Sequence, residues 1–186
     1  SYKAHAYIEA PYNGHRNCQT LNMNLMMTNA DETISFVVDQ GAERNFQWQL
    51  TGQVGSHDSF FGATINLWNS YLFSDTAKAV ELTLTPTAPL LNGSEGAVMV
   101  AEIPLDGHED ALLDIPVGLY TLQAVLIGHD DSRTSINVAT VDKVGTYTPE
   151  TAIAWESTGD CGFGWESGVE PVFISLDEEH PMSLSS

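Results

Sequence analysis

The sequence has few bases. Six lysine and arginine residues stand against 25 aspartate and glutamate residues, and the formal net charge at pH 7 is −19. Residues 79–132 and 144–186 contain no base at all. Such a chain repels phosphate backbones and anionic lipid, so neither nucleic acid nor a membrane is expected as a partner. A basic protein is the expected partner, although a solvated surface that serves solubility or a salty habitat explains the acidity equally well.

Cysteines are also scarce, because only Cys18 and Cys161 are present. Two cysteines are too few for a disulfide framework, and we expect two free thiols in a reducing compartment rather than a bridge. No signal-peptide pattern opens the sequence, so the cytoplasm is the favoured location, with export after signal removal as the alternative. No apolar run of about 18 residues occurs, so no membrane-spanning helix is expected.

Helical periodicity is nearly missing, and the dominant spacing of apolar residues is two. Segments 21–27, 46–54 and 80–85 alternate strictly between apolar and polar side chains, which indicates strands with one buried face. Other segments are strand-like in composition, and these are 4–10, 33–39, 96–103, 119–127, 135–141, 152–156 and 171–176.

One segment, 59–80, is compatible with either a helix or a strand. Ser74 or Asp75 could cap a short helical turn, whereas the β-branched Thr64 and Ile65 favour a strand. Many short strands without helices between them predict an all-β fold.

The expected architecture is a single-domain antiparallel β-sandwich, of which a jelly roll is one form. The sandwich is expected to span residues 1–178, followed by a frayed polar tail at 179–186. Within it, "GHDDS" at 128–132 separates two strand-like segments and has the residues of a hairpin turn, so we interpret it as a turn rather than a metal site.

The segment "DGHEDALLD" is the first candidate site. An EF-hand calcium loop is excluded, because Ala111 stands at the glycine position and Val117 at the position of the final acid. The simpler interpretation is an acidic loop between strands. The alternative is an irregular calcium site with Asp106, Asp110 and Asp114 as ligands, since calcium accepts scattered oxygens. No other cofactor is indicated.

The segment "WESTGDCGFGWESGVEPVF" is the second candidate site. Aromatic residues on a glycine-rich connection can form a binding surface or close one end of a core. Trp155 ends an apolar run and is expected in the core. Phe163 and Trp165 are the candidates for exposure, and with the acids Asp160 and Glu166 they form the expected binding site.

Catalytic patterns are weak. "GSHDS" contains Ser56, His57 and Asp58, but triad members meet by folding rather than by adjacency, and no nucleophile-elbow motif is present. With 25 acids in the chain, a pair of catalytic carboxylates cannot be picked out from sequence. An enzyme is therefore not the favoured class.

One resemblance adds to this interpretation. The order "IPVGLYTLQAVLI", "VAT", "AIAWE", "GDCGFGWESG" and "VFISLD" resembles a pattern in small bacterial β-proteins of the immunity or nuclease-inhibitor type, over roughly residues 115–177. Cys161 departs from that pattern. The resemblance implies a non-catalytic acidic protein that binds a basic protein partner. The alternatives are a carbohydrate-binding or calcium-dependent β-sandwich module, and a hydrolase with a carboxylate pair.

Overall fold

The computed structural model describes most of the chain from residue 60 onward and short pieces before it. The described residues are 26–27, 46–47, 49–53, 60–107, 110–156 and 169–181. They are mostly β-strand, which confirms the all-β prediction. The strands of the main sheet are β3 (Ala63–Leu67), β4 (Ala77–Pro86), β5 (Met99–Pro104), β6 (Ala111–Ile115), β7 (Tyr120–Gly128), β8 (Arg133–Thr140), β9 (Thr151–Ile153) and β10 (Val172–Pro181).

A separate two-stranded sheet and two 3-10 helices complete the described elements. Strands β1 (Met26–Met27) and β2 (Phe46–Gln47) pair with each other in a separate two-stranded sheet. The 3-10 helix η3 (Ser70–Leu72) follows β3, and η4 (Val141–Lys143) follows β8. The other strands predicted before residue 60, at 4–10 and 33–39, lie outside the described residues.

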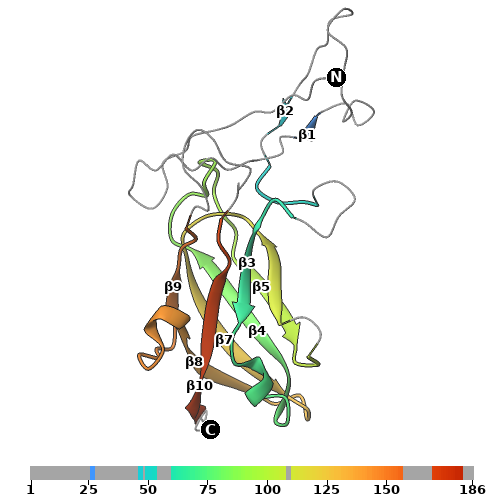
Figure 1. The fold of residues 1–186 in the computed structure, drawn as a ribbon, viewed down its shortest axis with the longest axis vertical. Coiled ribbons are helices and arrows are strands. Elements are labelled where there is room, and N and C mark those ends of the chain that lie inside the picture. The colour runs from blue at the N-terminus through green and yellow to red at the C-terminus, as the bar shows by residue number, and fades with distance from the viewer. Residues whose placement is uncertain are drawn as a thin grey trace, which may run out of the picture.

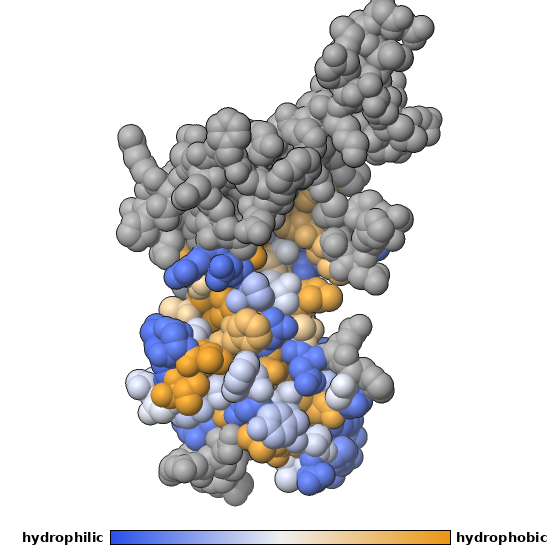
Figure 2. Space-filling view, in the orientation of Figure 1, coloured by the Kyte–Doolittle hydropathy of each residue, from blue (hydrophilic) through white to orange (hydrophobic). Residues whose placement is uncertain are grey.

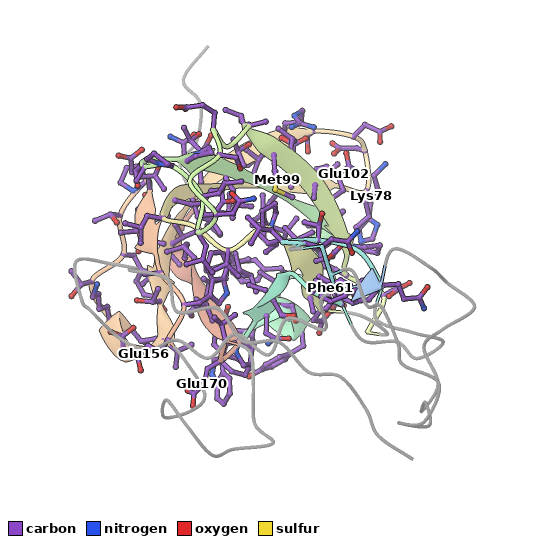
Figure 3. The ribbon with its side chains drawn as sticks, turned by 90° about the horizontal axis from the view of Figure 1, so that it is seen from above. Phe61, Lys78, Met99, Glu102, Glu156 and Glu170 are labelled. Carbon is purple, nitrogen blue, oxygen red and sulfur yellow. The ribbon has the colours of Figure 1, made fainter. Side chains whose placement is uncertain are left out.

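The main sheet is a single curled sheet with the strand order β5-β4-β7-β8-β10-β3-β6, and β9 pairs with β7 beside β8. Figure 1 shows the strands wrapped around a common interior, and Figure 3, seen from above, shows that side chains fill this interior. The shape is nearly that of a barrel. Strands β5 and β6, which join through residues 105–110, form the two ends of the order.

The expectation of purely antiparallel pairing needs one correction. Strands β3 and β10 run parallel, with Ile65 opposite Val172 and Leu67 opposite Ile174. The other pairs of the sheet are antiparallel. A parallel pair needs a long connection between its strands, and most of the described chain lies between β3 and β10.

Period-two alternation builds the core. In β4 and β7, every second side chain points inward, and Leu82, Leu84, Tyr120 and Leu122 are almost completely buried. Trp155 belongs to this core. It is 1 % exposed, its ring meets that of Tyr120 edge to face at 5.8 Å, and its indole N–H donates to the Thr64 carbonyl at 3.0 Å. The prediction of Trp155 as a core residue is confirmed.

The hairpin prediction is also confirmed. Strands β7 and β8 pair with Ile127 opposite Arg133, and the loop between them is closed by Gly128 N donating to Ser132 O at 2.8 Å. Asp131 takes a positive φ of 66° in this loop. Aspartate tolerates that conformation better than most residues, so the acid-rich loop is explained by its backbone geometry.

Two boundaries differ from the expectation. "DGHEDALLD" is not a loop throughout, because β6 begins at Ala111. Strand β10 extends to Pro181, which pairs with Ile136 of β8, so the strand overlaps the first residues of the predicted tail at 179–186, and the tail itself stays a prediction. The segment 59–80 resolves into a strand, a 3-10 turn and the start of β4.

Candidate functional site

Asp114, one of the three predicted calcium ligands, has a structural role. Its Oδ1 and Oδ2 both accept from Gly52 N at 2.9 Å, and Oδ1 also accepts from Gly62 N at 3.1 Å. Its φ is 58°, in the left-handed region. The carboxylate therefore fastens residues 49–53 and the start of β3 to β6.

The other two predicted ligands lie in different surroundings. Asp110 Oδ2 accepts from the Ser70 hydroxyl at 2.7 Å, and Asp106 is exposed in the loop before β6. Among the residues that the structure describes, no three His, Cys, Asp or Glu side chains form a group that could hold a metal ion. A calcium site with Asp106, Asp110 and Asp114 stays a prediction, and the structure does not draw these three together.

The predicted binding residues fall outside the described part of the chain. These are Asp160, Phe163, Trp165 and Glu166, and the same holds for Cys18, Cys161 and the "GSHDS" segment. The residues that flank 157–168 are described: Glu170 N donates to Glu156 O at 2.8 Å. The two acids that border the predicted binding segment are therefore neighbours.

A group of exposed apolar side chains was missed by the sequence analysis. We call it the aromatic surface, and it consists of Trp68, Tyr71, Leu72 and Phe173. Trp68 is 62 % exposed and Tyr71 70 %, and the rings of Trp68 and Phe173 meet edge to face with their centres 6.1 Å apart. Aromatic residues at this exposure are enriched in binding surfaces rather than on idle ones. Figure 2 shows apolar side chains reaching the surface among hydrophilic ones on the face in view.

The backbone around Trp68 explains why this side chain points outward. Ala63, Ile65 and Leu67 of β3 face the core, so the alternation, continued one residue past the end of the strand, places Trp68 outward. Trp68 N donates to Ile174 O at 2.8 Å.

Beyond this point the chain leaves β10, and the buried Asn69 side chain replaces the lost backbone pairing. Its Nδ2 donates to Leu176 O at 2.8 Å, and its Oδ1 accepts from Leu176 N at 2.9 Å. These two hydrogen bonds hold the backbone after Trp68 against β10. The same alternation places Phe173 outward, between Val172 and Ile174, which face inward. Alternation is therefore the feature of the sequence that could have identified Trp68 and Phe173 as outward-facing residues.

A groove adjoins the aromatic surface at Phe173. It has a volume of about 390 Å³ and lies outside the sheet, where β9 and the residues after it face the start of β10 and η4. Its apolar lining includes Phe173, Pro171, Ala152 and Ala154. This volume is within the range of about 300–1,000 Å³ that is usual for small-ligand sites.

Carboxylates surround the groove. Asp142, Glu156 and Glu170 line it and are exposed, and one base, Lys143, lines it as well. Figure 3 shows Glu156 and Glu170 close together at the outer edge of the molecule. Within the described chain, neither glutamate forms an ion pair with a base. The groove is thus a mainly acidic site with apolar walls.

The other described bases lie in ion pairs elsewhere. Lys78 pairs with Asp131, and Arg133 Nη2 lies 2.5 Å from Glu81 Oε1. Each pairing raises the pKa of the base, through the hydrogen bond to its partner first and the partner's charge second. Of the bases that the structure describes, only Lys143 therefore offsets the acids of the groove.

Comparison with known protein families, with curated proteins and with solved structures finds no match to this chain. The candidate site is therefore defined by its own geometry.

Within the described ranges, no helix is long and apolar enough to cross a membrane.

Proposed function

We propose that this protein is a non-catalytic binding protein that holds a basic protein partner, in the manner of an inhibitor or immunity protein. The observation that carries the proposal is the aromatic surface, with its exposed Trp68 and Phe173 in edge-to-face contact, beside a groove that three carboxylates line. Binding energy in protein interfaces concentrates in exposed aromatic anchors of this kind, surrounded by a polar rim.

The charge of the chain supports a basic partner. A net charge of −19 creates a field that accelerates the approach of a positively charged surface and disfavours acidic ones. Steering and anchoring are separate contributions in this proposal. The charge governs how fast the partner arrives, and the aromatic surface governs how long it stays.

The test is a selection from a displayed random-peptide library against the wild-type protein and against Trp68→Ala. We expect the enriched peptides to carry an excess of Arg and Lys together with apolar residues. Loss of Trp68 should cost about 2 kcal/mol of binding free energy, the size of an interface hot spot.

The matched control is Val100→Ala, because Val100 is 60 % exposed but lies on β5, away from the aromatic surface. It should leave peptide binding unchanged. Enrichment of neutral or acidic peptides, or equal losses in the two variants, would contradict the proposal. Salt-independent binding of a neutral oligosaccharide at Trp68 would instead favour the carbohydrate-binding alternative.

A further inference from the structure

The groove beside the aromatic surface has the chemistry to recognise one kind of side chain. Glu156 and Glu170 lie on neighbouring segments, joined by the 2.8 Å hydrogen bond from Glu170 N to Glu156 O, and both line the groove. Like charges on directly adjacent segments repel each other. A cation between the two carboxylates would turn this repulsion into attraction.

The walls of the groove favour an organic cation with an apolar stem. Phe173 is 40 % exposed and lines the groove, and Pro171 and Ala154 supply further apolar surface. An aromatic face attracts a cation placed over it, and long basic side chains bury their methylene groups against apolar walls. A hydrated metal ion would gain nothing from such walls, because calcium and magnesium take oxygen ligands.

We propose that the groove receives an arginine side chain of the partner, with its guanidinium group between Glu156 and Glu170 and over the ring of Phe173. The inference rests on the proposed function and names the partner group that the groove recognises. Arginine fits better than lysine because its planar fork can bond two carboxylate oxygens at once and stacks on aromatic rings. Lys143 reduces the negative charge of the groove but leaves it acidic, since three carboxylates line it.

The test uses three small probes, the N-acetyl amides of arginine, lysine and citrulline, titrated into the whole protein and followed by backbone amide shifts in NMR. Citrulline has the shape of arginine without its charge. We expect saturable shifts at residues 142, 156, 170 and 173 with the arginine probe, weaker ones with lysine, and none with citrulline.

The decisive variant is Glu156→Gln with Glu170→Gln, which should weaken arginine binding about tenfold, the loss expected for charge-assisted hydrogen bonds. Its control is Glu95→Gln with Glu150→Gln, two exposed acids outside the groove that change the net charge equally. The control should bind the arginine probe as the wild type does.

Equal losses in the two double variants, or equal affinity for arginine and lysine, would overturn the arginine site. If peptide selection still depends on Trp68 while the groove variants bind the arginine probe normally, the arginine site fails and the proposed function stands. If the arginine probe binds in the groove but peptide selection ignores Trp68, the arginine site is supported and the aromatic anchor is wrong.

Discussion

At the scale of single residues, Asp114 shows how an acid that resembles a metal ligand can serve the fold. Its carboxylate accepts three hydrogen bonds from the backbone N–H groups of Gly52 and Gly62, and its backbone takes a left-handed φ of 58°. Aspartate suits both demands, because it is an anionic acceptor and tolerates this conformation.

We therefore expect Asp114→Ala to lower the free energy of unfolding by about 2–4 kcal/mol, because it removes charge-assisted hydrogen bonds and keeps the strained φ. Asp114→Asn should cost about half as much, since asparagine keeps one acceptor oxygen and tolerates the same φ. Urea unfolding measures both. Asp131→Gly is the control: it relieves a φ of 66° and removes only an exposed ion pair, so it should change stability little. Equal losses for all three variants would contradict this role of Asp114.

Asp130 in the hairpin loop gives a prediction about pH. The hydroxyl and the N–H of Ser132 donate to its carboxylate and lower its pKa from the ordinary 3.8. A depressed pKa means that the stabilisation is present above the ordinary value and is lost as pH falls through the pKa in the folded protein. Carbon NMR titration should give a pKa below 3.8 in the wild type, and Ser132→Ala should shift it upward. An unchanged pKa in Ser132→Ala would contradict the hydrogen-bond cause.

At the scale of elements, the backbone at Gly62, just before β3, lies very close to the backbone of β6. Among the described glycines, Gly62 makes the closest approach to backbone atoms of another segment. A Cβ at Gly62 would lie 2.4 Å from the carbonyl carbon of Asp114 and 2.6 Å from Ile115 N. These are backbone atoms and cannot move aside as a flexible side chain could.

Gly62→Ala should therefore push β6 away from β3 and cost about 2 kcal/mol or more of stability. Gly107→Ala is a useful comparison, because Gly107 has a φ of +80° but open space around it, so only backbone strain opposes the change. Amide hydrogen exchange should show faster exchange in β3 and β6 for the Gly62 variant and no such local effect for the Gly107 variant. Faster exchange spread evenly over the sheet would contradict a local clash.

The elements also show what could be predicted from the sequence. Strand β4 contains the strictly alternating segment 80–85, and β7 and β8 are strand-like in composition and joined by recognisable turn residues, so the sequence identified these strands and the hairpin. Strand β6 was missed because its register against β3 shifts between Ile115 and Leu112, and the bulge with Asp114 interrupts the period of two. The parallel pairing of β3 with β10 depends on contacts between distant segments, which local patterns do not contain.

Less of the candidate site than of the fold could be predicted from the sequence. Trp68 and Phe173 are visible as outward positions once the inward residues of their strands are known. Their contact, however, arises only from the pairing of β3 with β10, and the groove arises because residue 156 lies beside residue 170. Proximity in space, rather than residue type, defines this site.

At the scale of the whole molecule, the net charge and the aromatic surface have separate effects on binding. The charge of −19 attracts a cationic partner before contact, over roughly a Debye length, which is about 10 Å at 0.1 M salt. The aromatic surface acts only at contact. The central claim is that both serve one basic partner.

The measurement that tests this claim most directly is the association and dissociation rate of the selected peptides, at low and high salt, with the wild type and Trp68→Ala. We predict that added salt slows association in both proteins, and that loss of Trp68 speeds dissociation about 30-fold with little change in association. Association that is independent of salt, together with dissociation that is unaffected by Trp68→Ala, would contradict the account.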